Sequence, residues 1–228
     1  MIISLSRIKI STPCIYIFLI ALLSGCTNSE NSENLKEGDL LLFQQLNCGD
    51  LCQAIEAVTD GVNGKEFSHC AIVVNINDTL KVVEAIGDHV QVNSIRNFLA
   101  RSGDTLEMKK TTVGRVKKKY VPLIQEATAF AKKQIGEPYD DEFLLKNGKW
   151  YCSELLYESF KEANNNSAFF KLEPMTFKDP KTDTFFPAWV EYYKQLNAEI
   201  PEGEAGINPG LISRSSKIQI INTERINF

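Results

Sequence analysis

Histidine is scarce in this chain of 228 residues, which contains only His69 and His89. A mechanism that uses a histidine as base near neutral pH must therefore use one of these two. Positive charge is limited as well, because 25 lysines and arginines stand against 29 aspartates and glutamates. With a net charge of −4 and no broad basic region, the composition does not favour nucleic acid as a partner. The short basic run 115–119 is expected to be a solvated strand end.

A second pair of cysteines or histidines with the spacing of a zinc site is also lacking, so we predict no metal and no cofactor. Cys48 and Cys52 are close enough in sequence to form a disulfide in an oxidising compartment, but they could equally be two free thiols. Cys70 lies in an apolar stretch, which is typical of a small core residue.

The N-terminal segment has the pattern of an export signal. Arg7 and Lys9 precede an uncharged apolar run, Cys14–Leu23, which is short for a membrane span. Leu23-Ser24-Gly25-Cys26 then resembles a bacterial lipobox, in which Cys26 becomes the lipidated first residue of the mature protein. We therefore predict a lipoprotein signal peptide over 1–25 and a membrane-anchored protein of the cell envelope. An ordinary cleaved signal is the alternative.

Residues 26–36 are mostly polar and contain no aromatic side chain, which predicts a flexible tether. The remainder, 37–228, is long enough for one sizeable core and is expected to form a single domain. Short apolar or alternating runs predict strands, and apolar spacing with cap or proline signals predicts helices. The predicted strands are 38–43, 68–76, 80–86, 90–92, 113–116 and 217–222, and the predicted helices are 50–58, 94–101, 122–135, 151–162 and 186–196. This order predicts an α+β fold.

Cys152 is the candidate nucleophile. It lies in Tyr151-Cys152-Ser153-Glu154, at the predicted start of a helix. Unpaired N–H groups and the helix dipole favour a thiolate there and could also stabilise an oxyanion. A buried structural cysteine is the alternative.

His69 is the candidate base, and Glu84 is the residue that could orient it. If the hairpin between their strands turns symmetrically about Asn77-Asp78, the numbers of paired residues sum to 155. Glu84 then lies on the same face as His69, diagonal to it and within reach of a long side chain. A register slip of one residue would move Glu84 to the other face. His89 is the rival base, but Gly87-Asp88-His89 is typical of an exposed turn.

The ordered motifs around these residues resemble the YiiX-type, circularly permuted papain-like hydrolases, relatives of the NlpC-type peptidoglycan endopeptidases. The histidine precedes the cysteine in sequence, as the permuted group requires. The resemblance covers roughly 35–222. The motifs are Gly38-Asp39-Leu40-Leu41, Ser68-His69-Cys70-Ala71-Ile72-Val73, Val83-Glu84-Ala85, Gly136-Glu137-Pro138-Tyr139-Asp140 and Tyr151-Cys152-Ser153-Glu154-Leu155.

The resemblance implies a permuted papain-like α+β fold, with a mainly antiparallel sheet or half-barrel packed against helices. It implies Cys152 as nucleophile at a helix N-terminus, His69 as base, Glu84 as orienting residue and Tyr139 near the substrate cleft. The Pro209-Gly210 turn also resembles the end of the family's fold, whereas 164–186 matches no family pattern.

The expected activity is that of a cysteine peptidase or amidase. The expected substrate is a peptide or peptidoglycan fragment. Two alternatives remain: a hydrolase or acyltransferase acting on lipid amides, and a binding module without turnover.

Overall fold

The computed structural model describes residues 34–44, 49–101 and 110–221. The predicted signal peptide, the lipidation site Cys26 and most of the tether lie outside these residues. Cys48 also lies outside them, so its pairing stays a prediction, although Cys52 is disulfide-bonded. Cys70 and Cys152 are free, buried thiols.

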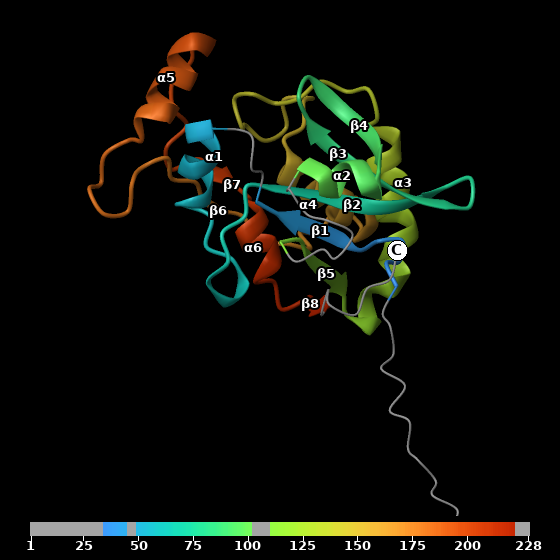
Figure 1. The fold of residues 1–228 in the computed structure, drawn as a ribbon. Helices are drawn as coiled ribbons and strands as arrows, with labels where there is room; N and C mark the ends of the chain where they lie inside the picture. Colours follow the sequence, from blue (N-terminus) through green and yellow to red (C-terminus); the bar gives the residue numbers. More distant parts are fainter. Residues whose placement is uncertain (1–33, 45–48, 102–109, 222–228) are drawn as a thin grey trace, which may run out of the picture. The chain divides into compact units, whose positions relative to one another are not determined.

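The described residues form an α+β domain whose elements largely follow the predicted ones (Figure 1). The strands are β1 (Leu40–Phe43), β2 (His69–Ile76), β3 (Thr79–Ile86), β4 (His89–Ser94), β5 (Thr112–Val116), β6 (Glu173–Pro174), β7 (Ala205–Gly206) and β8 (Ile218–Ile221). The α-helices are α1 (Gly49–Glu56), α2 (Ile95–Arg101), α3 (Ile124–Lys133), α4 (Cys152–Ala163), α5 (Pro187–Leu196) and α6 (Pro209–Ser213), and the 3₁₀ turns are Val62–Gly64 and Lys118–Leu123.

The main sheet is antiparallel, with strand order β4-β3-β2-β1-β5-β8. The β2–β3 hairpin has the predicted register, since its pairs run from Ile72↔Val83 to Ile76↔Thr79 and each sums to 155. Asn77 and Asp78 both have positive φ at the turn, a conformation that Asn and Asp tolerate better than most residues. Register and turn chemistry therefore agree.

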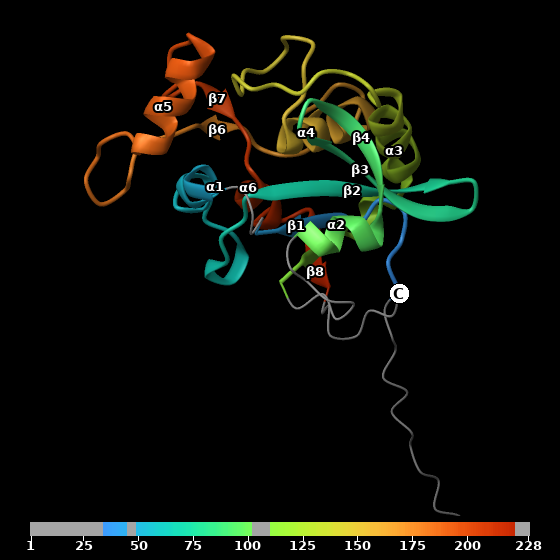
Figure 2. The same ribbon diagram turned by 45° about the horizontal axis from the view of Figure 1, so that its top comes forward.

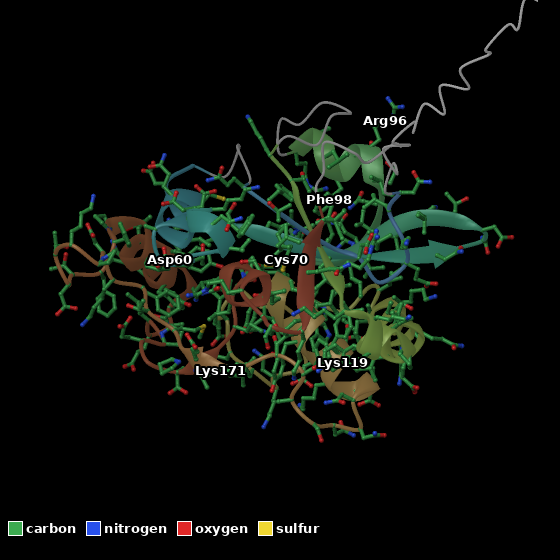
Figure 3. All side chains as sticks on the ribbon, turned by 90° about the horizontal axis from the view of Figure 1, so that it is seen from below. Asp60, Cys70, Arg96, Phe98, Lys119 and Lys171 are labelled. Carbon is green, nitrogen blue, oxygen red and sulfur yellow. The ribbon has the colours of Figure 1, made fainter. Side chains whose placement is uncertain are left out.

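Helices cover both faces of this sheet, as Figure 2 shows for α3 and α4 on one side and α2 on the other. Alternation along β2 directs Cys70, Ile72 and Val74 toward α3 and α4. Ala71 and Val73 face the opposite side, where Phe98 and Leu99 of α2 pack. Figure 3 shows the amphipathic character of α2, with Phe98 in the interior and Arg96 at the surface. The near-continuous apolar run in β2 thus reflects burial on both faces.

A second cluster of aromatic side chains lies between α1 and α5. Trp189 and Tyr193 of α5 pack with Phe177 and with Ala54 of α1. The ring centroids of Phe177 and Trp189 are 5.0 Å apart and nearly perpendicular, the edge-to-face geometry that aromatic rings favour. This cluster packs α5 against α1 and the segment around Phe177.

Two sequence predictions were wrong in detail. Pro209-Gly210 opens the short helix α6, capped by Asn208, whose side chain accepts the Leu211 N–H at 2.8 Å. In the basic run 115–119 the three lysines, Lys117 to Lys119, are exposed after β5 as predicted. Arg115 is not: it forms a bidentate ion pair with buried Asp39, with both N···O distances 2.7 Å. A buried carboxylate needs such a partner, and local composition does not reveal it.

Candidate active site

Cys152 is the first residue of α4. Tyr151 before it is extended, and the first helical hydrogen bond runs from the Leu155 N–H to the Tyr151 carbonyl at 3.1 Å. The N–H groups of Cys152 and Ser153 in the first turn therefore lie before the first helical hydrogen bond, as the sequence predicts. The Cys152 side chain is buried but still lines a cleft.

His69 begins β2, and its imidazole contacts Glu84 of β3. His69 Nε2 lies 2.7 Å from Glu84 Oε2, and both side chains are buried. Glu84 therefore lies on the same face as His69, as the predicted register requires. This contact directs Nε2 to the carboxylate and leaves Nδ1 for the thiol.

Glu84 is fully buried and has further partners that sequence reasoning missed. Asn93 Nδ2 donates to its Oε1 at 2.8 Å, and the guanidinium of Arg101 contacts both carboxylate oxygens. Burial alone would raise the pKa of Glu84, but the hydrogen bond with His69 and the charges of His69 and Arg101 lower it. The carboxylate is thus held charged beside the imidazole. The signal for Asn93 was its place on β4, where Glu84 pairs with Gln91 and Asn93 lies on the same face.

His69 meets Cys152 at the end of β2. The β2–β3 ladder runs from Ile76↔Thr79 back to Ile72↔Val83 and does not extend to His69 and Cys70 at the start of β2. Burial would lower the pKa of His69, but hydrogen bonds with Cys152 and Glu84 raise it to about 9. A pKa in this range favours the protonated imidazole at neutral pH.

The pKa of the Cys152 thiol is shifted in the opposite direction, below its ordinary value. A hydrogen bond from Cys70 is the largest contribution that lowers its pKa, and burial opposes it. The hydrogen bond and the charge of His69 also lower the pKa, to well below the ordinary value of a thiol. The two shifts together favour a thiolate–imidazolium pair at neutral pH.

Tyr139 lies beside this pair. Its N–H bonds the Asp88 carbonyl at 2.9 Å, and Trp150 N–H bonds the Pro138 carbonyl at 3.0 Å. The first bond ties the turn at 136–140 to the β3–β4 connection, and the second ties it to the segment just before α4. Burial and the negative charge of Cys152 raise the pKa of Tyr139 well above its ordinary value. The hydroxyl thus stays protonated near the thiolate.

His89, the rival base, is exposed at the start of β4. It does not line the cleft that contains Cys152, His69 and Tyr139. Of the two histidines, only His69 is therefore placed beside the candidate nucleophile.

The cleft has a volume of about 490 Å³ and a wall that is mostly apolar. Its apolar lining comes from α1, from the loop after Tyr139 and from the C-terminal segments. The residues that form it include Leu51, Ile55, Val58, Phe143, Met175, Phe177, Trp189 and Leu211. Sequence reasoning missed this wall, because 164–186 gave no pattern.

The start of α4 is held by buried polar contacts. Ser153 Oγ donates to the Ile207 carbonyl at 2.8 Å, and the Ile207 N–H donates to the Tyr151 hydroxyl at 3.3 Å. Glu154 accepts N–H bonds from Lys146 and from Tyr151, the residue before the helix. Burial raises the pKa of Glu154 to about 8. Its Oε2 has no hydrogen-bond partner within the described part of the chain.

Glu154→Gln tests this helix start through the pH dependence of stability. A carboxyl group whose pKa rises from 4.5 to about 8 on folding contributes stability that is lost as the pH increases between those values. Glutamine keeps an acceptor but does not ionise, so thermal denaturation should show a smaller loss of Tm between about pH 5 and about pH 8. The loss avoided is on the order of a few kcal/mol. Exposed Glu162→Gln on the same helix is the control. Parallel pH profiles for Glu154→Gln and wild type would contradict this assignment.

Within the described residues 34–44, 49–101 and 110–221, no helix has both the length and the apolarity needed to cross a membrane. In the same residues, no group of three or more histidine, cysteine, aspartate or glutamate side chains is placed to hold a metal ion.

Comparisons with known proteins agree with this architecture. The curated protein YiiX of Escherichia coli K12, itself uncharacterized, is 28% identical over 127 residues, which are 55% of this chain and 57% of YiiX. The match thus spans little more than half of that relative. A crystal structure of YiiX from Escherichia coli O157:H7, described as a metalloprotein, is 21% identical, with a TM-score of 0.67, and covers 83% of this chain and 98% of that one.

This structural likeness shows the fold, and the family follows from the sequence. The model of the permuted papain-like amidase family, YaeF/YiiX, C92, matches residues 34–222. That span contains every described element of the domain, from β1 to β8. The chain belongs to the permuted papain-like amidase family.

Proposed function

We propose that this chain is a cysteine hydrolase that cleaves an amide bond, with Cys152 as nucleophile, His69 as acid and base, and Glu84 as the residue that orients the imidazole. The observation that carries the proposal is the buried line of contacts from the thiol through His69 to Glu84. A structural cysteine in a helix would not need a buried histidine and carboxylate aligned behind it.

The reaction begins from the charged pair. The thiolate of Cys152 attacks the amide carbonyl carbon, and the carbonyl π electrons move onto oxygen. His69 donates its proton to the leaving amine as the C–N bond breaks, which leaves a thioester on Cys152. Neutral His69 then takes a proton from water, the resulting hydroxide attacks the thioester, and the carboxylic acid leaves as Cys152 is restored.

The oxyanion of each tetrahedral intermediate would lie near the N-terminus of α4. The N–H groups of its first turn and the positive end of the helix dipole favour negative charge at this position. Tyr139 stays protonated beside the sulfur and is the nearby side chain that can bind the substrate or this oxyanion. Glu84 stabilises the imidazolium without itself taking a proton.

The proposed substrate is a peptide or a peptidoglycan-derived fragment, and the proposed location is the cell envelope. The predicted lipobox at Cys26 supports the location, with a lipid anchor that holds the domain on a membrane.

A second candidate substrate is a lipid amide or another acylated amine, cleaved by hydrolysis or by acyl transfer. The apolar wall of the cleft favours it, because Leu51, Phe143 and Trp189 offer surface to an acyl chain. A module that binds without turnover would have no need of the Cys152–His69–Glu84 contacts.

The test is to incubate the soluble domain separately with muropeptides and with N-acyl amides and to identify products by mass spectrometry. Cleavage of muropeptides supports the first substrate class, and release or transfer of an acyl group supports the second. Alkylation of Cys152 without turnover of either substrate class would instead favour the binding module.

A further inference from the structure

We infer that Cys70 is a positioning residue: its thiol donates a hydrogen bond to the Cys152 sulfur and holds that sulfur as a thiolate beside His69. This inference rests on the proposed function, because it assigns a role at the same nucleophile. It departs from the expectation that Cys70 only fills the core.

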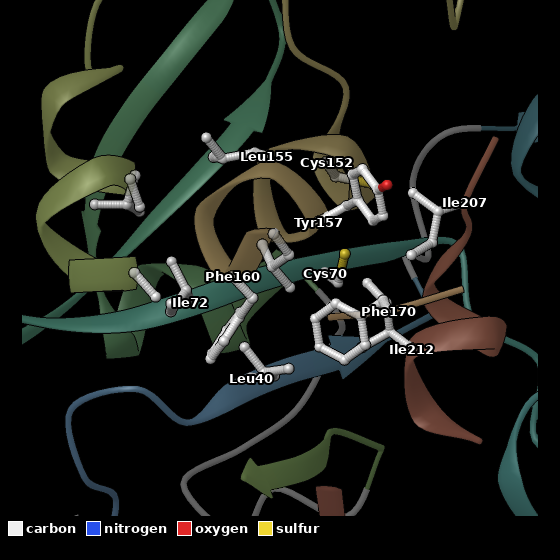
Figure 4. Close-up of a cluster of buried hydrophobic side chains, with 14 of the residues drawn as sticks. Leu40, Cys70, Ile72, Cys152, Leu155, Tyr157, Phe160, Phe170, Ile207 and Ile212 are labelled. Atoms are coloured by element: carbon white, nitrogen blue, oxygen red, sulfur yellow. The ribbon is translucent and has the colours of Figure 1, made fainter. Parts of the chain in front are cut away.

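The first argument is the direction of successive side chains on β2. His69 and Cys70 are neighbours on one strand, so their side chains leave it on opposite faces. Cys70 joins the cluster that contains Cys152 and Leu155, and it is fully buried there. Figure 4 shows its sulfur directed from β2 toward the start of α4, where Cys152 lies. Two consecutive residues therefore reach one sulfur atom from different sides.

The second argument is the backbone at this point. Successive N–H groups of a strand point to alternate neighbours, and the Val73 N–H bonds the Asp39 carbonyl beside β1. The Cys70 N–H therefore points toward β3, but the β2–β3 ladder ends at Ile72↔Val83. The thiol and the backbone N–H of Cys70 both act on Cys152 and lower the pKa of its thiol. The end of the ladder thus leaves a place where the sulfur can accept two hydrogen bonds.

The direction of the thiol–thiol hydrogen bond follows from the surrounding groups. The groups that interact with Cys152 are His69 and Cys70 from β2, Tyr139 from the turn, and Tyr151 at the helix start. Burial raises the pKa of Cys70 well above its ordinary value, and the charges of Cys152 and Glu84 add to this. Cys70 therefore keeps its proton and is the donor, while Cys152 carries the charge.

Cys70→Val is the direct test, because valine is of similar size but removes the thiol donor while it keeps the backbone N–H. The measurement is the rate of iodoacetamide alkylation on the peptide that carries Cys152, as a function of pH and without substrate. A lost hydrogen bond to a charged group should raise the apparent pKa of Cys152 by about one unit and slow alkylation at mildly acidic pH roughly tenfold. Cys70→Ser retains a donor and should remain within about twofold of wild type.

Two comparisons keep the outcome interpretable. Cys70→Ala removes the donor with less crowding and should show the same shift as Cys70→Val, with far-UV circular dichroism confirming that each variant is folded. If folded Cys70→Val or Cys70→Ala gives the wild-type profile, the inference is wrong. His69→Ala, measured in parallel, distinguishes a failure of the role of Cys70 from a failure of the proposed nucleophile–base pair. A shift in His69→Ala without a shift in the Cys70 variants overturns only the role of Cys70, whereas no shift in His69→Ala overturns the proposed nucleophile–base pair.

Discussion

Cys152→Ala is expected to abolish amide hydrolysis by this domain, with a loss of roughly a thousandfold or more in kcat/KM. The reason is that the proposed path passes through a thioester on this sulfur, and alanine provides no nucleophile at the start of α4. The measurement is product formation from the cleaved muropeptide or N-acyl amide. The change is small in volume and near the end of a buried helix, so the fold should persist.

The control is the exposed histidine variant His89→Ala, which should retain wild-type activity because His89 lies outside the cleft. Trapping of an acyl adduct on the peptide containing Cys152 would add direct support. Turnover by Cys152→Ala at the wild-type rate would mean that another residue is the nucleophile.

Glu84→Gln is expected to have the second largest effect, and it should change both catalysis and stability. Without the carboxylate charge, the pKa of His69 should fall from about 9 toward its ordinary value of 6.5. The alkaline limb of the activity profile should therefore move to lower pH, and kcat at neutral pH should fall about tenfold or more.

The stability change follows from the partners of Glu84. Arg101 would lose a buried counter-charge, at a cost of about 3 kcal/mol. A histidine whose pKa is raised on folding stabilises the fold fully below 6.5 and loses this contribution as the pH increases to about 9. Thermal denaturation of the variant should show less of this alkaline loss than wild type. Exposed Glu126→Gln on α3 is the matched control. An unchanged alkaline limb in Glu84→Gln would remove Glu84 from the proposed mechanism.

The sequence was sufficient for the parts of the site that depend on local periodicity. Alternation along 68–76 and 80–86, together with Asn77-Asp78, predicted the hairpin register that puts Glu84 on the face of His69. Helix-start signals before 152–163 likewise predicted the place of Cys152. In both cases the outcome depends on neighbours along the chain or across one turn, which the sequence pattern encodes directly.

The sequence could not predict the parts of the site that depend on contacts between distant segments. Arg101 binds Glu84 because α2 folds over one face of the sheet. Cys70 meets Cys152 because α4 packs on the other face, and nothing in an apolar strand distinguishes a core cysteine from a donor. The apolar wall of the cleft is assembled from α1 and the C-terminal segments, whose pairing no local period reveals.

The central claim is that sulfur and imidazole form a charged pair, and the pH dependence of Cys152 alkylation tests it most directly. The account predicts that the wild-type thiol reacts rapidly well below the pH at which an ordinary thiol ionises, about 8.5. His69→Ala should return the profile to that ordinary value, whereas His89→Ala should not. A wild-type profile with an ordinary midpoint, unchanged in His69→Ala, would contradict the account.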